Sequence, residues 1–220
     1  MSTINYFEQA EELAVFLRNA DVLTITQRSV ATTTATGTWT GATSHSLAVT
    51  NVKNIRSITV DGVALTYSDD YTVDYDFSDT TIKCKITLVA AQTGDYIITY
   101  DYGTDKIFPD FPKTGLTISN FPRIAVDLVS AASVAGGFGN VNENVTTFTV
   151  VAYATTTKTV RDILTAVRAA FITAQTSFKT IGKVVKPLSV GPMFVDREQG
   201  KDKVYHQNID FKATFHLEIN

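Results

Sequence analysis

Apolar and polar residues alternate at successive positions in several short segments between Asp21 and Lys106. A repeat of two places all the apolar side chains of a segment on one face of a β-strand. Asp61-Gly62 and Gly94-Asp95 mark turns between such segments. Thr is abundant here, and its branched Cβ favours strands. No helical repeat interrupts this stretch, so residues 22–106 are expected to form an all-β sandwich module.

Two segments outside this stretch have the repeat of an amphipathic helix. Apolar residues lie at helical spacing between Asn5 and Asn19 and again after Thr159. In the second segment, Thr159 and Asp162 are spaced as a variant of the capping box. The apolar stripe of that segment consists of Val160, Ile163, Leu164, Val167, Phe171, Ala174 and Phe178. Both segments are predicted to be helices that pack on a sheet.

Four extended segments complete this part of the chain. Val145–Ala154 is apolar on both faces, which is typical of a central strand, and residues 205–219 alternate almost strictly. Residues 124–128 and 184–195 are predicted to be the other two strands, and residues 130–144 a loop of small side chains. The predicted fold class is therefore α+β, with two helices on a mostly antiparallel four-stranded sheet. Residues 1–21 and 107–220 form this domain, and the sandwich of residues 22–106 (immunoglobulin-like) is inserted into it.

Composition narrows the possible functions. The chain has 220 residues, a net charge of −3 and one cysteine. A single cysteine excludes an internal disulfide framework, and the slightly acidic charge argues against non-specific nucleic-acid binding. No apolar stretch approaches the roughly 20 residues of a membrane span, and the N-terminus lacks the pattern of a secretory signal.

Residues capable of chemistry are sparse. His206 and His216 are too far apart on one strand to share a metal, and His45 lies in the Thr- and Gly-rich segment. Cys84 lies in an alternating apolar row, where a free cysteine acts as a small apolar residue. The glycines at 136–139 precede a strand rather than a helix, unlike a nucleotide-binding loop. The sequence predicts no enzyme activity, no metal site and no cofactor.

Three polar or aromatic groups leave other interpretations open. The acidic side chains between Asp69 and Asp79 are compatible with a Ca²⁺ site or with a solvated hairpin face. Lys179, Lys183 and Lys186 either stabilise the end of the second helix or make weak contacts with DNA phosphates. The tyrosines of the inserted module either pack its core or bind carbohydrate or a host surface; they are Tyr71, Tyr75, Tyr96, Tyr100 and Tyr102.

The order of predicted elements outside the module resembles the tail terminator (tail completion) proteins of long-tailed bacteriophages. The resemblance covers about 135 residues and depends on four phrases rather than on invariant motifs. These phrases are Phe121-Pro122-Arg123-Ile124-Ala125-Val126, Phe148-Thr149-Val150-Val151-Ala152-Tyr153-Ala154, Val160-Arg161-Asp162-Ile163-Leu164-Thr165-Ala166-Val167 and Tyr205-His206-Gln207-Asn208-Ile209-Asp210-Phe211. The inserted module departs from the compact members of that family.

The resemblance implies a structural virion protein, assembled in the host cytoplasm and located in the tail or neck. Its homo-oligomer, commonly a hexameric ring, would cap the tail tube protein and join it to the head-side connector protein. Genome DNA would pass through the lumen without specific binding, and no membrane is involved. Another neck, connector or tail-tube protein remains an alternative.

Subunit contacts are expected at two predicted loops, Ser130–Asn144 and Gly191–Lys203. Each contains a few apolar or arginine side chains among small or polar neighbours, as subunit interfaces do. The candidate interface residues are Val134, Phe138, Asn140, Met193, Phe194 and Arg197.

Overall fold

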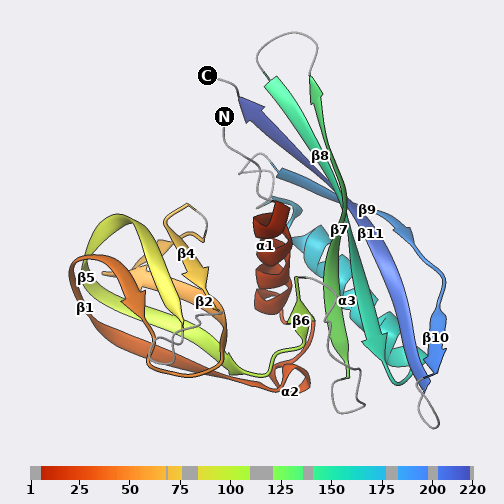
Figure 1. Ribbon diagram of the computed structural model, residues 1–220, viewed down its shortest axis with the longest axis horizontal. Helices are drawn as coiled ribbons and strands as arrows, with labels where there is room; N and C mark the ends of the chain where they lie inside the picture. Colours follow the sequence, from red (N-terminus) through yellow and green to blue (C-terminus); the bar gives the residue numbers. More distant parts are fainter. Residues whose placement is uncertain are drawn as a thin grey trace. The chain divides into compact units, whose positions relative to one another are not determined.

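The computed structural model describes residues 6–67, 69–75, 84–109, 121–135, 141–176, 183–197 and 203–218 (Figure 1). The chain divides into two compact units, Met1–Gln27 with Lys106–Asn220 and Arg28–Asp105. We call the first the outer unit and the second the inserted unit. The short helix α2 (Ile25–Arg28) lies where the chain passes from the outer unit into the inserted unit.

The inserted unit is built on one antiparallel sheet. Its strands are β1 (Val30–Ser46), β2 (Val52–Val60), β3 (Val63–Leu65), β4 (Tyr71–Asp74) and β5 (Lys85–Gly103). Within the described residues they form a five-stranded sheet in the order β1-β5-β2-β3, and β4 also pairs with β5. The prediction of a two-sheet sandwich is therefore wrong.

A bend in the sheet explains how a single sheet encloses a core. Ile86 and Ile98 lie on the same strand, β5, and would be about 40 Å apart if the strand were straight. Both nevertheless belong to one buried cluster that also contains Trp39 and Ile58. The register between β1 and β5 shifts between Trp39 and Ser44, and such irregularities bend a strand. The two halves of β5 therefore line the same core.

The outer unit contains a larger sheet. Its strands are β6 (Ile107–Phe108), β7 (Arg123–Ala135), β8 (Val141–Ala154), β9 (Lys183–Val190), β10 (Phe194–Arg197) and β11 (Lys203–Glu218). The described strands form a six-stranded sheet in the order β10-β11-β8-β7-β6, and β9 also pairs with β11. All pairs are antiparallel except β6 with β7. As predicted, Val145–Ala154 is central, because β8 pairs with both β7 and β11.

The predicted fold class is wrong for the chain as a whole. Strands account for 60% and helices for 21% of the described structure, in two sheets of five and six strands. The error in the outer unit arises from two short strands, β6 and β10, that the alternation did not reveal. Residues 130–135 and 141–144, predicted to be loop, also belong to strands β7 and β8.

Two helices pack on one face of the outer sheet. Helix α1 (Tyr6–Asn19) contacts β6 and β7, whereas α3 (Thr157–Thr173) contacts β8, β9 and β11. The residues of α3 that are fully or almost fully buried are Val160, Ile163, Leu164, Val167 and Phe171. The predicted cap is wrong: the hydroxyl of Thr156, not Thr159, caps α3 by accepting from the Thr159 N–H at 3.2 Å.

Candidate assembly surface

The structure places the six candidate interface residues in different surroundings. Val134 lies in β7, and Phe194 and Arg197 lie in β10. Met193 immediately precedes β10 and packs partly buried against the core of the outer unit. Phe138 and Asn140 lie outside the described residues, as do the glycines at 136–139.

Strand β10 forms an edge of the outer sheet, where Gly191 turns the chain out of β9. The backbone N–H of Gly191 donates to the Asn208 carbonyl at 3.0 Å, and the Gln207 side-chain amide donates to the Gly191 carbonyl at 2.7 Å. Both partners belong to β11, so β9 and β10 lie along the same side of that strand. We call this side the β9–β10 edge.

Exposed apolar side chains are concentrated on the β9–β10 edge. Four of the ten large apolar side chains that are exposed among the described residues lie there. They are Leu188, Val190, Phe194 and Val195, with exposures of 56%, 56%, 49% and 47%. Several exposed apolar side chains along one edge are characteristic of an interaction site, whereas single ones are ordinary.

An aromatic row crosses the sheet from this edge. The ring of Phe194 stacks on His206 with centroids 5.2 Å apart, and His206 lies 5.4 Å from the ring of Tyr153. These residues are direct partners across β10, β11 and β8. The Nδ1 atom of His206 is 2.9 Å from Oδ2 of Asp196. Phe194 is therefore held by a ring on the neighbouring strand although half of its surface is exposed.

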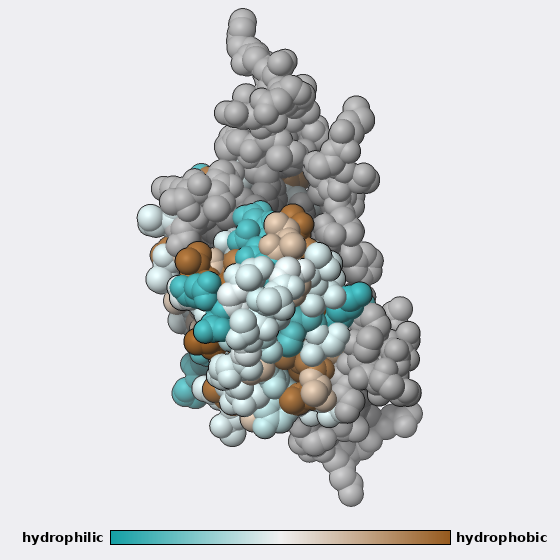
Figure 2. All heavy atoms as spheres, turned by 90° about the vertical axis from the view of Figure 1, so that its left-hand side faces the viewer, coloured by the Kyte–Doolittle hydropathy of each residue, from teal (hydrophilic) through white to brown (hydrophobic). Residues whose placement is uncertain are grey.

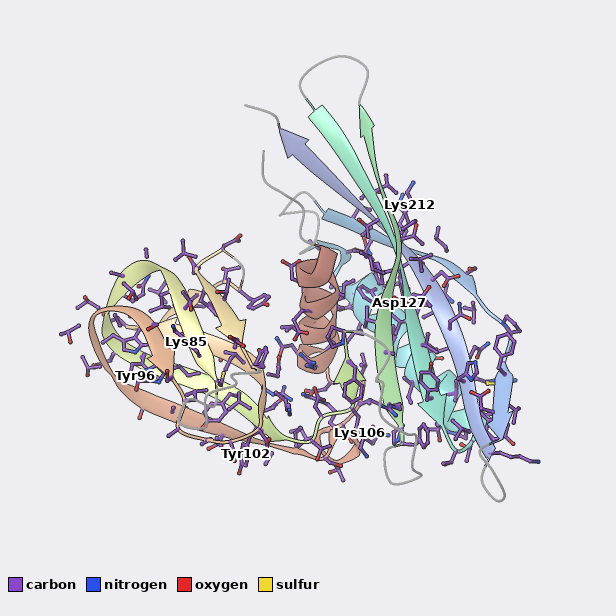
Figure 3. All side chains as sticks on the ribbon, viewed as in Figure 1. Lys85, Tyr96, Tyr102, Lys106, Asp127 and Lys212 are labelled. Carbon is purple, nitrogen blue, oxygen red and sulfur yellow. The ribbon has the colours of Figure 1, made fainter. Side chains whose placement is uncertain are left out.

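The opposite edge of the outer sheet has a different character. Strand β6 pairs only with Ile124 and Ala125, so the remainder of β7 pairs on one side alone among the described strands. From Val126 to Ala135 the sequence contains no proline and one charged residue, Asp127, which is labelled in Figure 3. An edge with neither lysine nor proline is suited to receiving another strand. In contrast, β9 contains Lys183, Lys186 and Pro187, which disfavour strand addition.

The cysteine and the histidines are the candidate reactive or metal-binding side chains of the sequence, and their surroundings in the fold bear on both roles. Burial, together with the charge of Asp74, raises the pKa of Cys84 to about 12, so the thiol stays protonated. His45 accepts a hydrogen bond at Nδ1 from Trp39 at 3.3 Å, and burial lowers its pKa. His206 lies beside Asp196, and the side chain of His216 is outside the described part of the structure. Within that part, no group of three or more metal-binding side chains is placed to hold an ion.

The acidic side chains between Asp69 and Asp79 and the three lysines near the end of α3 do not form a common site among the described residues. The Asp70 carboxylate accepts from the backbone N–H of Thr66 at 2.7 Å and closes a turn, and Asp74 pairs with Lys85 across β4 and β5. Asp76 and Asp79 lie outside the described residues, as does Lys179, whereas Lys183 and Lys186 belong to β9.

The tyrosines of the inserted unit are mostly engaged in packing. Tyr71 and Tyr100 are buried, and the hydroxyl of Tyr75 accepts from the Ile55 N–H at 3.1 Å. Tyr96 stacks on Trp39 with centroids 4.6 Å apart, over Gly37, where a Cβ would lie 2.6 Å from the Tyr96 hydroxyl. These contacts are those of aromatic side chains packed within the unit.

The exposed face of β1 is instead rich in hydroxyl groups. Its outward positions carry Thr34, Thr36, Thr38 and Thr40, all exposed. Figure 2 shows the inserted unit with a largely pale surface of intermediate hydropathy and scattered hydrophilic and hydrophobic side chains. This composition is typical of a solvated strand face and identifies no ligand.

No protein-family model matches the chain, and the search of curated proteins finds no match. No described helix is both long and apolar enough to cross a membrane.

Proposed function

We propose that the chain is a structural subunit that joins copies of itself into a ring, and that this ring is the terminator at the head-proximal end of a phage tail. The proposal depends chiefly on the exposed apolar side chains that lie along the β9–β10 edge. The position on the phage tail comes from the resemblance of the sequence to tail terminators. Partners would then be the tail tube protein and the head-side connector protein.

The two edges of the outer sheet favour a ring over a symmetric dimer. One is the apolar β9–β10 edge, and the other is the side of β7 that, beyond Ala125, pairs with no described strand. A contact between unlike surfaces repeats from copy to copy, and it closes into a ring when the rotation permits. Val134 of β7 and Phe194 of β10 are then expected on opposite sides of each subunit contact.

A charge on the β9–β10 edge tests the proposal. Val195→Asp places a carboxylate on an exposed position of β10, where the folded subunit tolerates it but a closed interface does not. We expect subunit affinity to fall by about a hundred-fold or more, measured by mass photometry across a dilution series. The circular dichroism spectrum of the variant should match that of the wild type.

Ile172→Asp is the matched control, since Ile172 is equally exposed, at 52%, but lies on α3. It should leave the oligomer intact. Wild-type protein that stays monomeric at every concentration and does not cap isolated tail tubes in electron micrographs would refute the proposal. A ring that Val195→Asp leaves unchanged would exclude this edge as the contact.

A further inference from the structure

Arg123, the first residue of β7, is a buried cation that forms no ion pair with an acidic side chain of the described residues. Its side chain is 3% exposed, and its Nε and Nη1 atoms have no hydrogen-bond acceptor. It makes no ion pair with a described carboxylate. Buried arginines normally bind carboxylates, because an uncompensated charge in a protein interior is costly.

The described groups around Arg123 do not accept from its Nε and Nη1 donors. The guanidinium carbon lies over the Phe108 ring, 5.1 Å from its centroid, and this contact supplies a π-electron partner but no oxygen acceptor. Tyr153 lies opposite Arg123 on β8, and its pKa is raised to about 12 by burial and by nearby Asp196. Tyr153 therefore remains a neutral phenol near neutral pH and cannot balance the arginine charge.

A second buried cation lies beside Arg123. Lys106 is 8% exposed, and its carbonyl accepts from the backbone N–H of Ile124, the residue that follows Arg123, at 2.8 Å. Burial and the charge of Arg123 both lower the pKa of Lys106. An anion bound at Arg123 would also be attracted by the nearby charge of Lys106. Lys106, labelled in Figure 3, immediately precedes β6 in the sequence.

We propose that Arg123, assisted by Lys106, binds an oxyanion, either a carboxylate or a phosphate group. A guanidinium group presents N–H donors in a planar fork that matches two oxygens of such a group. The oxyanion comes either from a free anion in solution or from an acidic side chain of a second copy of the chain. The inference does not depend on the ring or on the phage tail.

The first experiment tests whether a free anion binds to the folded protein and raises its melting temperature. Wild-type protein is melted in increasing inorganic phosphate with chloride adjusted to keep the ionic strength constant, and circular dichroism follows unfolding. If the site takes a free oxyanion, the midpoint should rise by about 4 °C or more at saturating phosphate. Arg123→Met should abolish the rise, and Arg123→Lys should retain part of it. Arg168→Met, which removes an exposed cation from α3, should retain all of it.

The second experiment tests whether a carboxylate of a second copy binds Arg123, by measuring the association of copies. In chloride alone, Arg123→Met and Arg123→Lys are compared with wild type by mass photometry. If a second copy supplies the oxyanion, both variants should dissociate at concentrations where wild type and Arg168→Met stay associated. The proposal is wrong if Arg123→Lys is folded and differs from wild type in neither the phosphate response nor the oligomeric state. If Arg123→Met does not fold, the Arg123→Lys comparison decides alone.

Discussion

Replacing Arg28 with methionine is expected to lower the free energy of unfolding of the inserted unit by about 3–5 kcal/mol. The Arg28 side chain is fully buried, and its Nη1 and Nε atoms lie 2.8 Å from carboxylate oxygens of Asp101 and Asp105. Both carboxylates are also buried, so the variant would leave negative charge in the interior with fewer partners. Arg56 and Thr32 still reach Asp101, at 2.7 Å each, and limit the loss.

Tryptophan fluorescence measures this effect directly. The chain has one tryptophan, Trp39, which is 4% exposed in the core of the inserted unit. Urea titration followed by Trp39 emission therefore reports unfolding of that unit. The control is Thr38→Val, which removes an exposed hydrogen bond between Thr38 and Asp95 in the same sheet and should cost about 1 kcal/mol or less. Equal midpoints for Arg28→Met and Thr38→Val would contradict the prediction.

The same cluster predicts a dependence of stability on pH. Burial alone would raise the pKa of Asp101, but hydrogen bonds from Arg56 and Thr32 and the charges of Arg28 and Arg56 lower it below the usual value. A carboxyl group with a lowered pKa in the folded state stabilises the fold above its unfolded pKa. This contribution is lost as the pH falls below about 4 and through the folded pKa. Urea midpoints from Trp39 emission should fall over that range, and less steeply in Arg28→Met.

The repeat of apolar residues predicted the elements better than their arrangement. The stripe on residues 160–171 identified α3 because five of its side chains are buried on one face. Alternation also identified the halves of β5, but the same pattern arises from two facing sheets and from one bent sheet. The bend depends on the shifted register between Trp39 and Ser44, which involves residues from two strands. A local repeat contains no such information.

The small side chains at the end of β7 led to a wrong prediction of secondary structure. Ala131, Ala132 and Ser133 have little intrinsic preference for strands, so the sequence predicts a loop there. In the structure they pair in register with residues 144–146 of β8. The partner strand decides their conformation, because backbone pairing does not require bulky side chains.

The candidate surface was predictable only in part. Met193 and Phe194 stood out as large apolar residues among Gly, Pro and charged neighbours. Arg28 and Arg123 had no comparable signal, since their burial is produced by residues from distant strands. For Arg123 these are Phe108 on β6 and Tyr153 on β8, brought together by the register of the sheet. A single sequence does not show which arginine will be enclosed.

The largest expected effect on the outer unit is that of Phe171→Ala. The Phe171 ring is completely buried, with centroids 4.9 Å from Phe16, 5.8 Å from Phe148 and 4.4 Å from Phe211. It therefore joins both helices to the sheet, and its removal leaves a cavity among three other rings that are fixed by their backbones. We expect the free energy of unfolding to fall by about 3–5 kcal/mol.

Far-ultraviolet circular dichroism measures this loss, since the two long helices α1 and α3 both belong to the outer unit. Ile172→Ala is the matched control: the neighbouring side chain is 52% exposed, so its truncation should change stability by about 0.5 kcal/mol or less. A Phe171→Ala variant as stable as Ile172→Ala would mean that the four rings do not form the core of this unit. A large loss in Phe171→Ala alone would locate the stability of the outer unit in the contact between its helices and its sheet.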